Sequence, residues 1–535
     1  MTEQMIEHLT LLTKQKHYRK DNHYGYETGR SPFIDYILED KESYKPLSSS
    51  ICRFTGKPWI DRDNDFLIGE SGGVLMKIDF VFVGTEIFSR VADFYEKHGC
   101  YCLEPDDSPN AVKFWQREMD RRVKGVQAYC KLYIKDIPAY LAAKSDAERK
   151  ALLHKVRITG DHYNYLNYGR IERAPNEKER KQLDKEGRFK VNTVEGFPRF
   201  WDGDYWNFKI DELIANNSCN LCKAKARRKG FSYKRGSQAA NTINANKNVT
   251  VTLAADQMDY LTEKGATSYM VKVNLDWYED KTYWRRGYLS ENFDKGIELG
   301  YKKSKEGQKA FGFRSKLLSV AIGKNESAAV GKKAIETDFE EAGKCPNLQK
   351  ALDVMMSNSE SGAMRIGTIR VYGTGGTKGA NWEAFSNCFY NPGKNDMLPM
   401  ENIWDANSRH AVCGFFFPQI WDYEPFIEDG NSLLFASWKD DYDKKRGAEK
   451  EKDAGEYNIY VGQRANSPNE AFTNTQENIF HSPELTNHIN AIKYDKSNHF
   501  YEDGWYILDD GRVRLLLNRN VLNELYLVPI DSMSI

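Results

Sequence analysis

Strand-like and helix-like hydrophobic patterns alternate through the middle of the chain. Residues 248–254 (NVTVTLA) alternate apolar and polar positions and are rich in β-branched side chains, which predicts a strand. Segments 316–322, 333–339 and 367–372 also predict strands, and residues 232–246 predict a helix. Because strands that alternate with helices favour a mostly parallel sheet, we expect an α/β fold with helices flanking that sheet.

The two ends of the chain carry weaker patterns. Apolar and aromatic residues recur at helical spacing over residues 110–141, which predicts a helix there. Segments 177–190 and 440–456 are rich in charges, and we interpret both as solvent-exposed helix or loop. The Asp-Gly pair inside residues 504–517 predicts a hairpin with that pair as its turn.

These patterns divide the chain into three regions. A length of 535 residues allows about three or four structural units, and 40% hydrophobic residues are enough to build buried cores. We expect an N-terminal extension over residues 1–195, an α/β core over residues 196–405 and a smaller α+β region over residues 406–535.

Composition narrows the classes of function. Lys+Arg 77 balances Asp+Glu 77, so the chain lacks the basic excess of a constitutive nucleic-acid binder, and any DNA contact must be local. The 9 cysteines have no framework spacing, the N-terminal segment is polar, and no apolar run approaches the roughly 20 residues of a membrane span. We therefore expect a soluble intracellular protein with no membrane association. The Cys219–Cys222 pair stands alone, which makes a zinc site improbable.

The most informative segment is KAKARRKGFSYK, residues 223–234. A predicted strand leads into it and a predicted helix leads out, which is the setting of a phosphate-binding loop, because the N–H groups at a helix start attract anions. Gly230 would let the backbone approach the phosphates closely, and the Ser232 hydroxyl could hold Mg²⁺.

This segment departs from the standard phosphate-loop pattern. Phe231 follows the glycine where a lysine is usual, but Lys225 could reach the β and γ phosphates from the opening of the loop. Arg227 and Arg228 add positive charge, which phosphoryl transfer requires. The alternative interpretation of this segment alone is the basic start of a surface helix.

An acidic pair lies about a hundred residues downstream, in AIETDFEEAG. Glu340 and Glu341 end a predicted strand, and two adjacent carboxylates repel each other unless a cation lies between them. An ATPase needs one carboxylate for Mg²⁺ and a second to orient the attacking water. The strand is unusually polar, which leaves its register open by one residue and keeps Asp338 as a second candidate. The alternative is the acidic start of a helix.

A glycine-rich strand end, RVYGTGG at residues 370–376, follows. It would place the Thr374 hydroxyl at the carboxyl edge of the sheet, where open α/β sheets bind ligands. The alternative is an ordinary glycine turn. The order of the three motifs favours the functional interpretation.

Together these motifs resemble the large terminase subunits of tailed bacteriophages. In that family a lysine opens a deviant phosphate loop, a strand ends in two acids followed by Ala-Gly and Pro-Asn-Leu, and a coupling motif matches Gly-Thr-Gly-Gly. Residues 161–170, 197–206 and 464–472 are also similar, so the resemblance covers residues 110–480. It implies a P-loop NTPase fold of the ASCE type, with a mostly parallel sheet flanked by helices.

The resemblance also implies roles for individual residues. It places Lys225 on the β and γ phosphates, Ser232 and Glu340 on Mg²⁺, and makes Glu341 the catalytic base. Arg228, or its neighbour Arg227, would stabilise the transition state, and Thr374 would sense the γ-phosphate. The remaining nucleotide-binding residues would be Lys229, Gly230, Phe231 and Tyr233 in the loop, and Trp201, beside Phe200, at the adenine.

The function implied is an ATP-hydrolysing motor that moves double-stranded DNA into a procapsid. Its partners would be the portal protein, the small terminase subunit and further copies in a ring, in the host cytoplasm and transiently docked on the portal. Terminases usually continue into a nuclease with several converging carboxylates, and we find no such set after residue 472, so we expect that domain to be missing. The alternatives are a helicase-like translocase and a non-catalytic adaptor with a degenerate phosphate loop.

Overall fold

The computed structural model describes residues 90–130, 154–217 and 219–472 apart from short gaps, together with isolated short segments before and after them. The gaps are residues 176, 294–295, 303–308, 324–332, 362–363, 376–381, 406–411, 429 and 451–453. Described parts of residues 131–153 are single positions and short runs. No helix among the described residues is long and apolar enough to cross a membrane.

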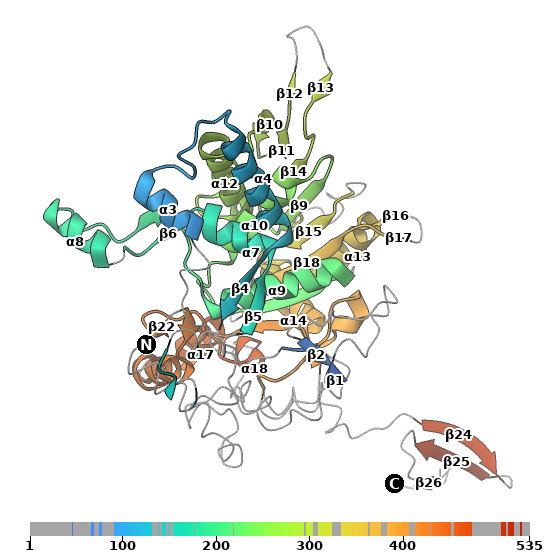
Figure 1. The fold of residues 1–535 in the computed structure, drawn as a ribbon. Coiled ribbons are helices and arrows are strands. Elements are labelled where there is room, and N and C mark those ends of the chain that lie inside the picture. The colour runs from blue at the N-terminus through green and yellow to red at the C-terminus, as the bar shows by residue number, and fades with distance from the viewer. Residues whose placement is uncertain are drawn as a thin grey trace.

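The centre of the molecule is an eight-stranded, mostly parallel sheet with strand order β10-β11-β14-β9-β15-β18-β8-β21 (Figure 1). Six neighbouring strands run parallel, and two antiparallel strands complete one edge. The parallel strands are β8 (Leu221–Lys225), β9 (Thr250–Ala255), β14 (Lys316–Ala321), β15 (Glu336–Phe339), β18 (Thr368–Thr374) and β21 (Phe415–Phe417). The antiparallel pair is β10 (Tyr288–Asn292) and β11 (Gly296–Leu299). The predicted α/β fold class is therefore confirmed.

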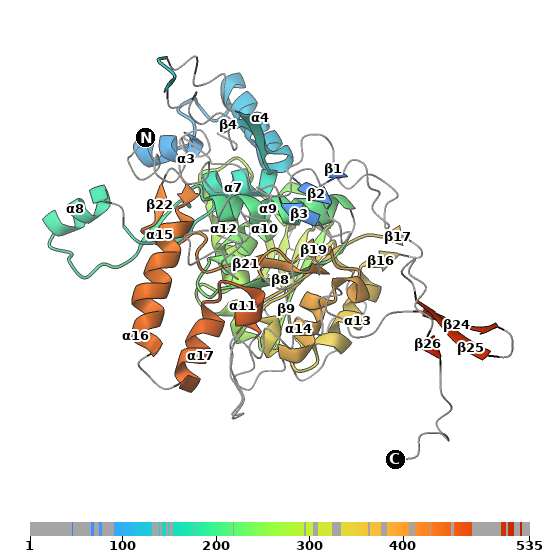
Figure 2. The ribbon, with the colours of Figure 1, turned by 90° about the horizontal axis from the view of Figure 1, so that it is seen from below.

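Helices cover both faces of this sheet, as Figure 2 shows. One face carries α7 (Gly160–Tyr168), α9 (Asp202–Asn217), α10 (Phe231–Ala245) and α12 (Thr267–Lys281). The other carries α13 (Leu348–Asn358) and α14 (Trp382–Tyr390). The predicted helix over residues 232–246 is confirmed as α10, which starts directly after Gly230, a residue in the left-handed conformation with φ 66°. That turn changes the chain direction between β8 and α10.

The sequence order and the spatial order of the strands differ at one important place. Strand β18 lies between β8 and β15, in parallel with both. β21 forms the edge beyond β8, so the sheet includes a strand from beyond residue 405, the predicted end of the core.

The predicted helix over residues 110–141 is wrong at residues 125–130, and most of residues 131–141 lie outside the described residues. Helix α4 (Pro109–Lys124) ends at Gly125, whose backbone has φ 81°. The chain then forms β4 (Val126–Cys130), which pairs with β5 (His154–Ile158). The positive φ at Gly125 breaks the helix, and a Cβ there would lie 2.1 Å from the Ile158 carbonyl oxygen, so only glycine fits this turn. Helical spacing alone did not reveal that break.

Of the two charge-rich segments, residues 177–190 are largely exposed, whereas residues 440–456 are partly buried. Helix α8 (Glu177–Lys185) is largely solvent-exposed, as predicted. The predicted exposure of residues 440–456 is wrong in part, because Asp441 and Arg446 are buried and paired with each other at 2.9 Å. Arg446 also pairs with Glu470 at 2.7 Å. Arg446 is the last residue of η7 (Asp440–Arg446), and Glu470 belongs to α18 (Pro468–Ala471), so this contact joins the two elements. η7 continues α15 (Leu434–Lys439) and is followed by α16 (Gly447–Lys450).

Shorter elements surround the core. The two strands of the predicted hairpin are confirmed as β24 (Gly504–Asp509) and β25 (Arg512–Leu517), paired in antiparallel register, while its predicted turn, residues 510–511, lies outside the described residues. A second sheet joins β1 (Lys45–Pro46), β2 (Phe66–Ile68), β3 (Val74–Met76), β19 (Met400–Glu401) and β20 (Val412–Cys413). The remaining elements that bear on the site are α3 (Arg90–His98), α11 (Asp259–Thr262), η5 (Ala342–Lys344) and α17 (Ala454–Gln463).

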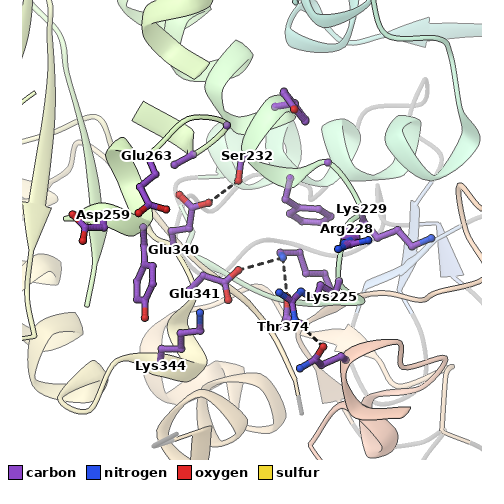
Figure 3. A pocket seen from close by; sticks show the side chains of 18 of the residues that line it. Lys225, Arg228, Lys229, Ser232, Asp259, Glu263, Glu340, Glu341, Lys344 and Thr374 are labelled. Atoms are coloured by element: carbon purple, nitrogen blue, oxygen red, sulfur yellow. Dashed lines mark hydrogen bonds and ion pairs between the residues drawn. The ribbon is translucent and has the colours of Figure 1, made fainter. Parts of the chain in front are cut away.

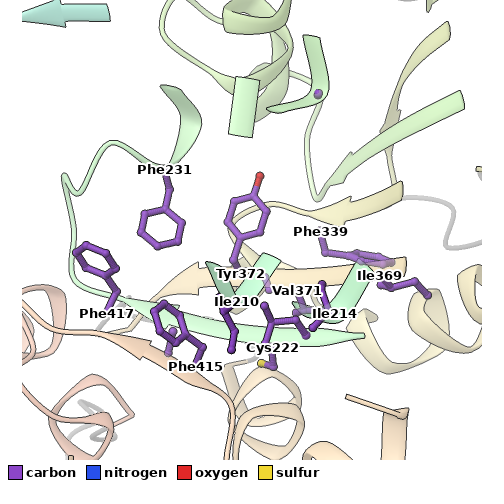
Figure 4. Packing of buried hydrophobic residues seen from close by; sticks show 14 of the residues in the cluster. Ile210, Ile214, Cys222, Phe231, Phe339, Ile369, Val371, Tyr372, Phe415 and Phe417 are labelled. Atoms are coloured by element: carbon purple, nitrogen blue, oxygen red, sulfur yellow. The ribbon is translucent and has the colours of Figure 1, made fainter. Parts of the chain in front are cut away.

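Aromatic packing fixes the start of α10 on the sheet (Figure 4). The Phe231 ring is 7% exposed and packs edge-on against Phe417 of β21, with ring centroids 5.4 Å apart. Its centroid lies 6.3 Å from that of Tyr372 on β18. Burial of an aromatic side chain stabilises the fold by about 1.5–3 kcal/mol. Phe231 therefore anchors the start of α10 to two strands of the sheet.

Candidate nucleotide site

A cavity of about 660 Å³ lies at the carboxyl ends of the parallel strands. The loop between β8 and α10 forms one side of it, and the ends of β15 and β18 form another. Three sequence motifs that lie up to 150 residues apart thus meet at one place. Figure 3 shows the side chains of the cavity, with Lys225, Ser232, Glu340, Glu341 and Thr374 around its centre.

Lys225 is the cation at the centre of this cavity. It is the last residue of β8, directly beside Thr374 in the parallel register with β18. Its Nζ donates to Thr374 Oγ1 at 2.9 Å and lies 3.6 Å from Glu341 Oε1. The residue is 8% exposed, so its charge faces the cavity instead of bulk water. This geometry agrees with the predicted position of Lys225 at the opening of the loop.

Ser232 and Glu340 lie together on the opposite side of the cavity from Lys225 (Figure 3). Ser232 Oγ, in the first turn of α10, donates to Glu340 Oε1 at 2.9 Å. The second oxygen of Glu340, Oε2, is buried and accepts no hydrogen bond of normal geometry from the described residues. Burial, and to a smaller extent the neighbouring Glu341 carboxylate, raises the pKa of Glu340 to about 7. The nearby Thr267 hydroxyl lowers the pKa of this carboxyl, which partly opposes the effect of burial. The Ser232 hydroxyl and the Glu340 carboxylate are two oxygen ligands of the kind that a hard cation such as Mg²⁺ prefers.

The register of the acidic strand is resolved by the structure. Glu340 and Glu341 follow β15 and line the cavity, whereas Asp338 is fully buried and bonded to Arg235 of α10. Asp338, the second candidate from the sequence, is therefore not at the site. Glu341 itself has φ 51°, a conformation that is uncommon outside glycine and asparagine and often marks functional positions.

Arg227 and Arg228 both line the cavity, but the structure treats them differently. Arg227 is tied to α17, since its N–H donates to the Gln463 carbonyl at 2.7 Å and its Nη1 to Gln463 Oε1 at 2.8 Å. Arg227 thus joins the loop to the following helical segment. Arg228 has a left-handed backbone with φ 62°.

Lys229 differs from its predicted role. Its ammonium donates to the carbonyl oxygens of Gln419 and Trp421, both at 2.6 Å, so it does not point to the centre of the cavity. Burial lowers its pKa to about 7. The Phe231 ring likewise belongs to the core, as described above. For these two residues only the peptide groups remain candidates for phosphate contact, together with that of Gly230. Tyr233 and Gly230 line the cavity as predicted.

A second cavity, of about 350 Å³, lies on the other side of the loop between β8 and α10. It shares Arg228, Lys229, Gly230 and Tyr233 with the first cavity. Trp201, Tyr165 and Pro198 contribute aromatic and apolar surface to it. Phe200 is not part of either cavity, because its ring is 1% exposed and stacks on His162 with centroids 5.4 Å apart. Of the two predicted adenine contacts, only Trp201 is placed where a ligand could reach it.

Several residues of the first cavity were not predicted. Asp259, Tyr260 and Glu263, from α11 and the residue after it, form a wall that carries two carboxylates. Lys344 of η5 lies over the Tyr260 ring at 4.3 Å from its centroid. Lys344 follows the Glu-Glu-Ala-Gly motif directly, so its proximity could have been inferred. The α11 residues carry no motif, and only the pairing of β9 with β15 brings them to the site.

Comparisons with known proteins give little beyond this geometry. No known protein family matches the chain, and no curated protein matches it. Among solved structures, the large terminase ATPase domain of Thermus phage P74-26 matches with TM-score 0.30 and 13% identity, over 46% of this chain and 89% of that one. An arginine-to-alanine mutant of that domain matches with TM-score 0.23 and 15% identity, over 33% and 68% of the two chains. Similarity at this level does not support a functional assignment.

Proposed function

We propose that this chain is a Mg²⁺-dependent ATPase, and that it is the motor of a DNA-packaging machine of the large terminase type. The observation that carries the ATPase is the meeting of Lys225, Ser232, Glu340, Glu341 and Thr374 in one cavity at the carboxyl edge of a parallel sheet. The packaging role rests on the resemblance of the three motifs and their order to those of terminases.

Binding of the phosphates would use the loop and the start of α10. Backbone N–H groups after Gly230 point along the helix start, where the helix dipole favours anions. Lys225 would transfer its hydrogen bond from Thr374 to the β and γ phosphates, which would leave the Thr374 hydroxyl free to contact the γ-phosphate. Phosphate binding would thus change the hydrogen bonding of Thr374, the last residue of β18, through Lys225.

Mg²⁺ would be held by the Ser232 hydroxyl and Glu340, and it would neutralise charge on the phosphate oxygens. Glu341 would accept a hydrogen bond from the attacking water and orient it toward the γ-phosphorus. Its pairing with Lys225 at 3.6 Å keeps the carboxylate on the cavity side of the strand. Arg228 would add the positive charge that the transition state requires.

The second cavity would receive the nucleobase. It adjoins the phosphate loop, and the Trp201 and Tyr165 side chains give it aromatic surface on which a base can stack. The apolar lining and the adjacent loop together match the expected division of a nucleotide site into a base pocket and a phosphate pocket.

Steady-state ATP hydrolysis by the purified chain, with and without double-stranded DNA, tests this proposal. We expect turnover in the parent and a loss of about 100-fold or more in Glu341→Gln and in Lys225→Ala. Lys316→Ala is the matched control, because Lys316 pairs with Glu298 at 3.0 Å on β14, away from the cavity, and should leave turnover unchanged.

The outcomes separate the remaining functions. Activity that survives in both site variants would contradict the assigned roles. Nucleotide binding with no hydrolysis, even when a portal is supplied, would favour the non-catalytic adaptor. Hydrolysis stimulated by DNA, with no packaging into procapsids in a complete assembly, would favour the helicase-like translocase.

A further inference from the structure

A chain of six buried charges runs under the candidate site, outside both cavities. Its members come from α9, α10 and the three strands that carry the nucleotide motifs. The cations are Lys223 of β8, Arg235 of α10 and Arg370 of β18, and the anions are Asp211 of α9 with Glu336 and Asp338 of β15. Five of the six residues are at most 4% exposed, and the Glu336 side chain is 15% exposed.

The contacts connect these elements without a break. Lys223 Nζ lies 2.6 Å from Asp211 Oδ1, and Arg370 Nε lies 3.2 Å from the same oxygen. Arg370 Nη1 lies 3.6 Å from both Asp338 Oδ1 and Glu336 Oε2. Arg235 completes the path from α10, with Nε donating to Asp338 Oδ2 at 2.8 Å.

Two further side chains of α10 donate hydrogen bonds to carboxylate oxygens of the network. Gln238 Nε2 donates to Asp211 Oδ2 at 3.0 Å, and Thr242 Oγ1 donates to Glu336 Oε1 at 3.2 Å. Three positive and three negative groups balance, which limits the high cost of burying each charge alone. Replacing such a cluster by apolar residues would often stabilise a core, so its use here calls for an explanation other than stability.

The position of the network supplies that explanation. Glu336 and Asp338 lie on the same face of β15 as Glu340, because side chains alternate along a strand. Arg235 lies three residues after Ser232 on α10, so it is one turn below the hydroxyl that meets Glu340. The forked Arg235–Asp338 contact thus fixes α10 against β15 directly beneath the Ser232–Glu340 contact. Arg370 and Lys223 extend the same constraint to β18 and β8, which end in Thr374 and Lys225.

We propose that Arg235 and Arg370 are positioning residues, which hold the phosphate loop, the acidic pair and the coupling strand in mutual register through this buried network. This inference rests on the proposed ATPase function. The arginines touch none of the reacting groups. The planar guanidinium of Arg235 donates hydrogen bonds in fixed directions to two carboxylates, Asp338 and Glu336, which the single point charge of lysine does not do. Arg370 donates to Asp211 through Nε, and its Nη1 lies at ion-pair distance, 3.6 Å, from Asp338 and Glu336.

Arg235→Lys and Arg370→Lys test the proposal, since both keep the charge and remove the planar guanidinium with its directed Nε hydrogen bond. We expect kcat to fall by about 10-fold to 100-fold in each, because small displacements of reacting groups have effects of that size. The Kd of a fluorescent ATP analogue should change by less than about threefold, because the phosphate loop itself remains. The kcat is to be calculated from the concentration of sites that bind the ATP analogue, so that unfolded protein does not lower its value.

Arg122→Lys is the matched control. Arg122 is also fully buried, and its Nε donates to Asn241 Oδ1 of α10 at 2.6 Å, but it has no contact with β15 or β18. We expect a lower melting temperature and an unchanged kcat in this variant. If the network variants match the control, with lower stability and parental kcat, the network only stabilises the core and the proposal is wrong.

Two further outcomes are distinguishable. A parent chain that binds no nucleotide would contradict the proposed function, whereas an active parent with fully active network variants would contradict only this inference. Should Arg235→Lys not fold, Thr242→Val decides in its place, because it removes one hydrogen bond to Glu336 and keeps side-chain shape. For that variant we expect a fall in kcat of roughly threefold with unchanged nucleotide affinity, and parental kcat would contradict the inference.

Discussion

Ser232 Oγ, in the first turn of α10, lies 2.9 Å from Glu340 Oε1 at the end of β15. The two residues are 108 positions apart in the sequence, and the parallel sheet alone brings them together. Because Glu340 Oε2 is buried and accepts no hydrogen bond of normal geometry from the described residues, this pair is incomplete as a hydrogen-bonded unit. A cation that binds both side chains would complete it.

The first prediction concerns this pair. Ser232→Ala removes one ligand, so we expect the affinity for Mg²⁺ in the presence of ATP to fall by about tenfold or more, measured by titration of Mg²⁺ into the nucleotide complex. Ser237→Ala on the same helix is the control, since Ser237 Oγ accepts from Asn164 at 3.0 Å away from the cavity. Equal Mg²⁺ dependence in both variants would remove Ser232 from the metal site.

The second prediction separates two lysines that lie four positions apart. Lys225→Met should lower nucleotide affinity by about tenfold or more, because it removes a charge-assisted contact to phosphate. Lys229→Met should instead lower stability, because the carbonyl oxygens of Gln419 and Trp421 lose their donor. A lost buried partner costs about 1–3 kcal/mol, which corresponds to a melting temperature lower by several degrees.

Both variants are to be measured for nucleotide Kd and melting temperature. The reverse pattern, with Lys229→Met weak in binding and unchanged in stability, would return Lys229 to the phosphate site. The sequence alone could not assign these roles, since both residues are lysines in one basic loop. The difference arises because β8 ends at Lys225 inside the site, while the loop then turns and directs Lys229 toward the segment after β21.

A third prediction tests the division of the nucleotide site. Trp201→Ala should weaken ATP binding by about fivefold or more, since base stacking on an aromatic side chain contributes about 1–3 kcal/mol. Binding of inorganic tripolyphosphate should not change, because that ligand contacts only the phosphate loop. If both ligands lose affinity equally, Trp201 supports the loop and does not contact the base.

The polarity of β15 shows both the reach and the limit of sequence reasoning. The motif Glu340–Glu341 and the strand before it were predictable, but Glu336 and Asp338 obscured the register of that strand. A buried strand tolerates these two acidic side chains because they pair with Arg235 and Arg370. The positions of the two arginines depend on how α10 packs on the sheet and on the order of the strands. Pairing across a sheet cannot be inferred from local periodicity, so the buried network was not predicted.

Local geometry explains the other differences. The start of α10 and strands β9 and β14 were predictable because their hydrophobic period and the glycine before α10 agree with the fold. Helix α4 was predicted too long because Gly125 ends it by adopting a positive φ, which composition does not reveal. Similarly, Asp441 and Arg446 were expected to be exposed because a charged run usually is, but they pair with each other in the interior.

The last prediction concerns His162, a fully buried residue of α7 whose ring lies between Phe200 and Phe208. Neither ring nitrogen has a hydrogen-bond partner among the described residues. Burial, with smaller contributions from the Lys234 and Lys209 cations, lowers the pKa of His162 from 6.5 to about 3. Between these two values the unfolded chain binds a proton that the folded chain excludes, so stability falls as pH falls through this window.

His162→Phe should therefore make the protein less sensitive to acid. The histidine contributes a loss of about 1.4 kcal/mol per pH unit below 6.5, or roughly 2 kcal/mol at pH 5, which phenylalanine in the same aromatic stack does not show. Urea unfolding at pH 7 and at pH 5 measures this difference, with His98→Gln on the exposed end of α3 as the control. If the parent and His162→Phe lose the same stability between the two pH values, His162 is able to bind its proton in the folded state, and the packing around it is more polar or more open than the structure has it.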